Sequence, residues 1–199
     1  MAVTLKDLLS LENYARLRPT LRSNAMSLRQ QRQVRLHDNL LLQFENDETV
    51  RYQVQEVLRA ERLFEPDEIS QELEAYAPLM SDGHSWTATM FLEFPDPAER
   101  RLMLAKWVGI DQGLYLRVDG SSLMCRAHSN AATSTPCEGV DGVTRSPAVH
   151  FLRFTPTQQM LEALRVDTDA RWVLGCDHPA CTREMPVPER VRQLLLAEI

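Results

Sequence analysis

The sequence lacks several features that mark well-known protein classes. It has no uncharged apolar run near the ~18 residues that a membrane-crossing helix requires. Its opening residues, Met-Ala-Val-Thr-Leu-Lys-Asp, place charges where a secretory signal needs an apolar segment. We therefore expect a cytoplasmic protein. In that compartment its 4 cysteines should be reduced thiols or metal ligands rather than structural disulfides.

Signatures of the common enzyme classes are missing as well. The chain has no glycine-rich phosphate loop, dinucleotide fingerprint, HExxH motif or nucleophile elbow. Its 44% apolar and 25% charged residues are ordinary for a globular protein. The 199 residues favour a single compact domain, 1–199. The alternative is a helical N-terminal lobe, 1–80, packed against a sheet-rich lobe, 84–199.

Lysine is scarce, and the remaining positive charge is unevenly distributed. Only Lys6 and Lys106 are lysines among 22 basic residues, and the net charge is −6. Residues 14–37 contain six arginines and no acidic residue, so the rest of the chain carries −12. Biased genome composition could produce the same preference for arginine. The alternative is that the guanidinium groups serve planar, bidentate pairing.

The arginine-rich segment is predicted to be a helix that has Pro19 in its first turn and continues to about Gln33. At 100° per residue, one core-facing stripe contains Leu17, Leu21, Ala25 and Leu28. The neighbouring stripe contains Arg18, Arg22, Arg29 and Arg32. This stripe predicts a face that binds anions or a partner protein. The alternative is a solvated or internally ion-paired face, and the acidic chain without interleaved aromatic residues makes nucleic-acid binding unlikely.

The rest of the chain alternates between hairpin and helix patterns. Two hairpins are expected, at 34–44 around Asp38-Asn39 and at 114–127 around Asp119-Gly120. Further strands are expected at 86–94, 148–154 and 171–175, and a long loop at 129–147. Helices are expected at 48–64, 66–77, 97–107, 156–164 and 188–198. The pattern predicts an α+β fold with an antiparallel or mixed sheet packed against several helices and a helical N-terminal part.

A carboxylate in an apolar stripe is the first candidate for chemistry. Glu61 falls among the stripe residues of the predicted helix 48–64, which are Val50, Val54, Val57 and Phe64. Burial would raise its pKa unless a cation or metal compensates, so Glu61 and the nearby Glu56 are candidate catalytic residues. The alternative is a buried acceptor for an arginine or tyrosine from another element.

The second candidate is the segment Gly175-Cys176-Asp177-His178-Pro179-Ala180-Cys181. His178 beside Asp177 fits a general acid or base oriented by a carboxylate. His178, Cys176 and Cys181 are also potential ligands for iron or zinc, together with Glu61 or with Cys125, His128 or Cys137. The C-x4-C spacing is not that of a standard zinc site, so free thiols are the alternative.

Several segments together resemble an uncharacterised bacterial family, the domain of unknown function 3501. They are Leu8-Leu9-Ser10-Leu11-Glu12, Phe44-Glu45-Asn46, Thr49 to Glu56, Leu58-Arg59-Ala60-Glu61-Arg62, Asp96 to Arg100, Ala148 to Phe154, and Asp177-His178-Pro179. The resemblance implies a role in redox or peroxide handling only by association, because members occur beside genes for rubrerythrin-like proteins and iron–sulfur oxidoreductases.

Three functional hypotheses follow. The first is an accessory or binding protein that acts with a rubrerythrin-type protein and an iron–sulfur oxidoreductase through the arginine face. The second is a metal-dependent enzyme or metalloprotein whose pocket joins Glu61, Glu56, Asp177 and His178, which requires Glu61 and His178 to meet in space. The third and weakest is an RNA-binding regulator.

Overall fold

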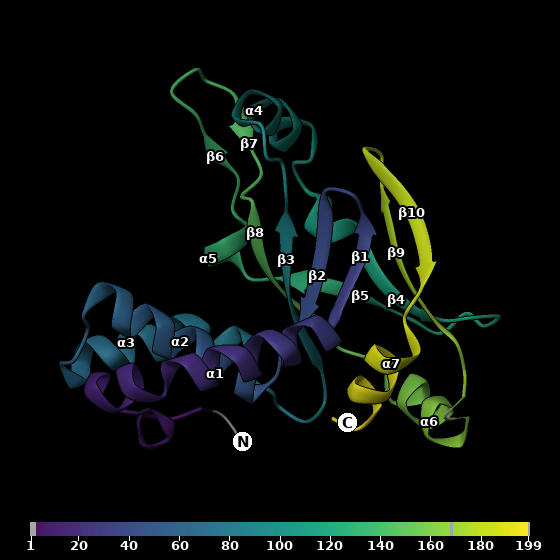
Figure 1. Cartoon of the computed structure of the whole chain (residues 1–199). Coiled ribbons are helices and arrows are strands. Elements are labelled where there is room, and N and C mark those ends of the chain that lie inside the picture. Colours follow the sequence, from purple (N-terminus) through teal and green to yellow (C-terminus); the bar gives the residue numbers. More distant parts are fainter. Residues whose placement is uncertain (1–2, 168, 199) are drawn as a thin grey trace.

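The computed structural model describes residues 3–167 and 169–198 and has the predicted α+β fold (Figure 1). The helices are α1 (Leu11–Gln31), α2 (Asp47–Glu61), α3 (Pro66–Tyr76), α4 (Pro97–Lys106), α5 (Ala131–Ser134), α6 (Gln158–Val166) and α7 (Glu189–Leu196), with 3-10 turns η1 (Leu5–Asp7), η2 (Ala77–Leu79) and η3 (Ile110–Gly113). The strands are β1 (Gln33–His37), β2 (Leu40–Phe44), β3 (Trp86–Leu92), β4 (Leu114–Val118), β5 (Met124–Ser129), β6 (Cys137–Glu138), β7 (Thr144–Arg145), β8 (Val149–Phe154), β9 (Trp172–His178) and β10 (Cys181–Pro186). Within the described residues, no helix combines the length and apolar character needed to span a membrane.

Eight antiparallel strands form one curved sheet in the order β1-β2-β3-β8-β5-β4-β9-β10. The curvature brings the first and last strands, β1 and β10, close to each other. The concave side holds the main core, in which the rings of Trp86 and Trp172 lie 4.9 Å apart. The indole of Trp86 donates to the carbonyl of Leu195, which ties α7 to this core.

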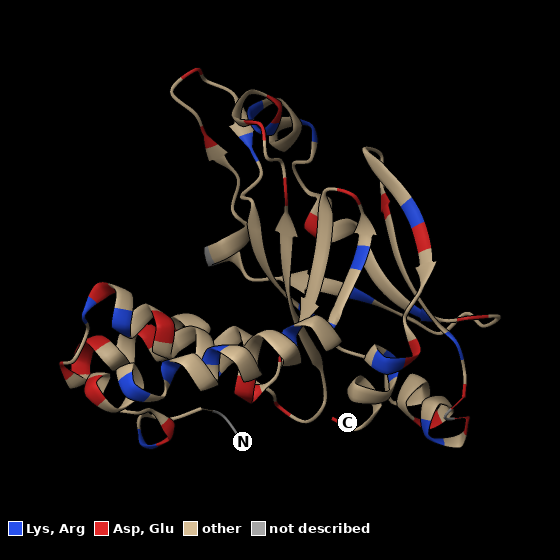
Figure 2. Ribbon diagram, in the orientation of Figure 1, with Lys and Arg blue, Asp and Glu red and all other residues tan. Residues whose placement is uncertain are grey.

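The N-terminal helices form a second layer against the other side of the sheet. Val50, Val54 and Leu58 of α2 pack with Leu79 of η2, and Phe151 of β8 borders this cluster. Strand β3 is therefore buried on both faces. Figure 2 shows mainly positive residues on α1, both signs on α2 and negative residues on α3, while β3 and β8 are largely uncharged.

The predicted start of the first long helix is wrong, whereas its predicted core-facing stripe is confirmed in part. Helix α1 begins at Leu11, where the Ser10 hydroxyl accepts from the backbone of Asn13, and it continues through Pro19. Tyr14 and Ala25 are its buried residues, while Leu17 is 51% exposed. Leu21 and Leu28 of the predicted stripe are half-buried, so the buried face, which includes Tyr14, lies slightly nearer to the arginine stripe than predicted. The neighbouring arginine stripe consequently faces the protein more than expected.

The C-terminal half also departs from the predicted elements. The predicted loop at 129–147 contains α5 and the small β6–β7 hairpin. Strand β9 continues beyond the predicted end at 175 to His178 and pairs with β10. The segment 176–181, with its candidate ligands, therefore lies in a β-hairpin. A glycine is needed within β9, since a Cβ on Gly175 would lie 2.2 Å from the ring of Tyr115. This hairpin fixes where the candidate cysteines and histidine lie.

Candidate functional site

The predicted Glu61–His178 pocket does not exist. Glu61 is exposed at the end of α2, whereas His178 ends β9 on the far side of the sheet (Figure 1). The Nε2 atom of His178 lies 3.1 Å from the carbonyl oxygen of Val108, and its Nδ1 accepts from the backbone of Ala180. Asp177 instead pairs with Arg126 at 2.6 Å. The four predicted catalytic residues therefore fall into two separate groups, Glu56 and Glu61 on α2 and Asp177 and His178 at the end of β9.

Glu61 is not aimed at the core because α2 is shorter than predicted. The helix ends at Glu61, and Arg62 adopts a left-handed conformation with φ of 60°. This turn removes Phe64 from the helical stripe and leaves it 67% exposed. The apolar face of α2 accordingly ends at Leu58, so a carboxylate at position 61 meets solvent.

Glu56 is the shared acceptor of an ion-pair cluster between α1 and α2. Its carboxylate accepts from the Tyr14 hydroxyl at 2.6 Å and from two nitrogens of Arg18 at 2.7 and 2.8 Å. Arg59 approaches to 3.6 Å. The hydrogen bonds from Arg18, more than any other group, lower the pKa of Glu56 to about 2. A carboxylate held ionised in this way suits a structural acceptor better than a proton-transferring residue.

Most arginines of the predicted cationic face form contacts within the protein. Arg18 binds Glu56, and Arg32 is 1% exposed and donates to the backbone carbonyls of Phe44 and Glu45 as well as to Glu198. Arg29 is half-buried. Among these four residues Arg22 is the exposed one. The alternative interpretation, an internally ion-paired face, describes the helix better than a partner-binding face.

The cysteines do not assemble a metal site with their predicted partners. Within residues 3–167 and 169–198, no group of three or more His, Cys, Asp or Glu side chains is positioned to hold a metal ion. Cys125, Cys176 and Cys181 are buried free thiols, while Cys137 is exposed. Cys176 and Cys181 are neighbours, and hydrogen bonding from Cys176 lowers the pKa of Cys181 to about 7.

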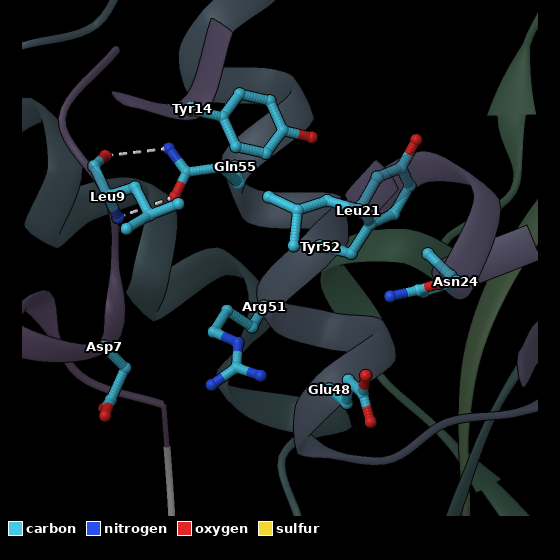
Figure 3. Close-up of a pocket in the computed structure, with 10 residues that line it drawn as sticks. Asp7, Leu9, Tyr14, Leu21, Asn24, Glu48, Arg51, Tyr52 and Gln55 are labelled. Atoms are coloured by element: carbon cyan, nitrogen blue, oxygen red, sulfur yellow. Dashed lines mark hydrogen bonds between the residues drawn. The ribbon is translucent and has the colours of Figure 1, made fainter. Parts of the chain in front are cut away.

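A groove lies between the N-terminal segment and the first two long helices (Figure 3). Its volume is about 230 Å³, and its lining residues are Asp7, Leu9, Tyr14, Leu21, Asn24, Ala25, Glu48, Arg51, Tyr52 and Gln55. The amide of Gln55 bonds both the N–H and the carbonyl of Leu9, at 2.9 and 3.0 Å. These two bonds attach the N-terminal segment to α2 and form one wall of the groove.

A second hollow, which we term the helix–sheet cavity, lies where the helical layer meets β3 and β8. Its volume is about 280 Å³, and its lining residues are Arg29, Glu45, Val50, Gln53, Tyr76, Leu79, Thr89, Phe91, Val149 and Phe151. They come from α1, α2, α3, η2, β3, β8 and the segment after β2. Convergence of so many elements on mixed apolar and polar side chains is typical of a small-molecule site.

Glu45 is the buried acid of the helix–sheet cavity. The residue is 5% exposed, and its carboxylate accepts from Gln43 at 2.7 Å, Thr89 at 2.7 Å and Thr49 at 2.5 Å. All three donors are neutral. In the described part of the chain, no Lys, Arg or His side chain forms an ion pair with Glu45. The buried carboxylate thus has hydrogen-bond partners but no counter-charge.

Arg29 is the cation of the same cavity. One terminal nitrogen donates to Gln53 at 2.7 Å, and the guanidinium lies 5.4 Å from the ring centre of Tyr52. Its Nε atom is buried and has no hydrogen-bond partner in the described structure. Beside it, the rings of Tyr76 and Phe151 lie 5.7 Å apart, and burial, as the largest influence, raises the pKa of Tyr76. An unpaired donor and two rings in contact, tilted by 40°, therefore line one small space.

Sequence reasoning identified Arg29 for another role and missed Glu45. The only local signal was that Glu45 directly follows an apolar strand. The family resemblance contained a better signal for this cavity. Three of its segments contribute lining residues: Phe44-Glu45-Asn46, Thr49 to Glu56, and Ala148 to Phe154. The residues are Glu45, Val50, Gln53, Val149 and Phe151. Segments about 100 residues apart meet there.

Comparisons with known proteins agree with this resemblance. The family described as "Protein of unknown function (DUF3501)" matches residues 2–199. The crystal structure of a novel protein of unknown function from Burkholderia pseudomallei K96243 is similar over 100% of both chains, with 33% sequence identity and a TM-score of 0.89. No curated protein matches the sequence.

Proposed function

The chain belongs to the DUF3501 family, and from that premise we propose that it is a ligand-binding accessory protein of a cytoplasmic redox or peroxide-handling system. In this proposal it acts with a rubrerythrin-type protein and an iron–sulfur oxidoreductase. The helix–sheet cavity supports the binding role, and the family resemblance supports the redox setting. The two parts are tested separately.

The buried, unpartnered Nε–H of Arg29 is the observation that carries the binding role. A buried donor without an acceptor costs about 1 to 3 kcal/mol. A ligand whose oxygen accepts from this nitrogen would remove that cost, and the bond would be strengthened by the guanidinium charge. The apolar and aromatic lining would supply the rest of the affinity by burying the body of the ligand.

Thermal unfolding with a panel of small metabolites tests the binding role. A ligand at 100 times its Kd should stabilise the protein by about 2.7 kcal/mol, which is a rise in Tm of several degrees. The rise should disappear in Arg29→Met and persist in Arg22→Met, the matched control on the same helix whose side chain is exposed. Unchanged melting with the whole panel, or equal shifts in both variants, would overturn the binding role.

Co-purification tests the redox setting. A tagged copy of the chain, isolated at low ionic strength, should retain the rubrerythrin-type protein and the iron–sulfur oxidoreductase. Arg22→Glu should weaken the association, because Arg22 is the exposed member of the arginine stripe. Glu68→Gln, on the exposed surface of α3, is the control. Failure of both partners to associate at low salt would contradict this part of the proposal.

A further inference from the structure

The helix–sheet cavity contains two opposite charges that the protein leaves without counter-charges. Glu45 is bound by a glutamine and two threonines, and Arg29 by a glutamine and a tyrosine ring. Among the described residues neither forms an ion pair. Buried charges are normally paired, because removing a charge from water without a partner is unfavourable. Two such charges on the wall of one cavity form a complementary surface for a ligand that carries both signs.

The unused hydrogen-bonding capacity of Arg29 and Glu45 indicates which ligand group each residue would bind. Arg29 has its Nε–H unsatisfied, and a guanidinium edge matches a carboxylate in a planar, charge-assisted pair. Glu45 accepts three hydrogen bonds, whereas a carboxylate offers about four lone-pair sites. One further donor, such as the N–H of an ammonium group, can therefore be accommodated beside Gln43, Thr49 and Thr89.

The remaining lining specifies an apolar body of small size. Val50, Leu79, Phe91, Val149 and Phe151 provide apolar surface, and the Tyr76 ring lies against Phe151, tilted by 40°. At ~30 Å³ per water molecule, the 280 Å³ cavity has room for about nine waters. That space suits a single amino acid or a molecule of similar size.

We propose that the helix–sheet cavity binds a small zwitterion of the α-amino acid type, with its carboxylate on Arg29, its ammonium group on Glu45 and an apolar side chain against Phe151 and Tyr76. This inference rests on the proposed binding function and names its ligand class. Binding in this orientation supplies a counter-charge to the buried Glu45 and to the half-buried Arg29 at once, which neither a simple anion nor a simple amine can do.

Calorimetric titration with matched probes tests the ligand class on the full chain. The probes are L-phenylalanine, L-leucine, 3-phenylpropionate, which lacks the ammonium group, and phenethylamine, which lacks the carboxylate. At least one amino acid should bind tenfold or more tightly than either single-charge probe. Equal or tighter binding of a single-charge probe overturns the zwitterion while leaving the binding function intact. No binding of these probes, together with no stabilisation by the metabolite panel, overturns both.

Two variants assign the charges within the cavity. Glu45→Gln should abolish the preference for phenylalanine over 3-phenylpropionate, and Arg29→Met should abolish its preference over phenethylamine. Arg22→Met should retain both tenfold preferences. If Glu45→Gln does not fold, Arg29→Met and the probe series on the native chain still decide the question. Retention of both preferences in Arg29→Met would show that the carboxylate binds elsewhere and would overturn the proposed orientation.

Discussion

Arg18 and Glu56 join α1 to α2 through two parallel hydrogen bonds of 2.7 and 2.8 Å. The Tyr14 hydroxyl adds a third bond to the same carboxylate. Both helices also border the helix–sheet cavity, to which α1 contributes Arg29 and α2 contributes Gln53. The ion pair therefore helps to hold the two helices in the relative position that the cavity requires.

Glu56 should make stability depend on pH in the acidic range. Its pKa is about 2 in the folded protein and near 4.5 when it is unperturbed. The lower folded value stabilises the protein fully above pH 4.5, and this contribution is lost as the pH falls through 4.5 towards 2. Glu56→Gln should cost about 1 to 3 kcal/mol at pH 7 and flatten this dependence, measured by urea denaturation at pH 7 and pH 3.

Glu12→Gln on the exposed surface of α1 is the control for this experiment. It should leave both the stability at pH 7 and its acid dependence close to those of the native chain. If Glu56→Gln and Glu12→Gln behaved alike, the Arg18–Glu56 pair would contribute nothing measurable.

Arg32 should act on stability and not on partner binding. It is buried, and its removal would leave the carbonyl oxygens of Phe44 and Glu45 without their donor. Arg32→Met should lower the free energy of unfolding by about 3 to 5 kcal/mol. Arg22→Met should change it by less than about 0.5 kcal/mol. Chemical denaturation of the two variants side by side measures the difference, and similar losses would contradict the buried role.

His150 should destabilise the protein as the solution becomes mildly acidic. Its ring is fully buried between the hydroxyls of Ser134 and Ser146, each at 3.0 Å. Burial lowers its pKa below 6.5, and the opposing influence of Asp111 is smaller. The unfolded chain therefore takes up a proton at a higher pH than the folded one, so stability falls as the pH drops below 6.5.

His150→Gln should remove the fall in stability below pH 6.5. Its stability at pH 8 should also be lower than that of the native chain, because the hydroxyls of Ser134 and Ser146 lose their ring partner. Thermal melts between pH 8 and pH 5 give the slope. Exposed His84→Gln is the matched control and should keep the native slope. A native slope in His150→Gln would mean that another group is responsible.

The four cysteines should differ strongly in reactivity. Cys137 is exposed, whereas Cys125 is buried and its pKa is raised to about 12 by desolvation. Since the thiolate is the reactive form, a thiol reagent at pH 7.5 should label Cys137 at least about tenfold faster than Cys125. Mass spectrometry of timed samples measures both rates. Cys137→Ser should remove the fast phase, and its persistence would contradict the assignment.

Local sequence determined most of the elements. Asp38-Asn39 and Asp119-Gly120 lie in the turns of the predicted hairpins, and Asn46 and Asp96 cap α2 and α4 as expected. These features depend on the conformational preferences and hydrogen bonds of residues within one turn of each other, so they can be derived without the rest of the chain. The α+β class followed from them.

Only the tertiary structure decided where function is to be sought. The buried face of α1 contains Tyr14 and Ala25, and Arg18, Arg29 and Arg32 beside it make internal contacts where a binding surface was predicted. The early end of α2 exposed Glu61. Arg29 and Glu45 line one cavity because two layers pack together there. Such relationships depend on long-range packing, which no local pattern specifies.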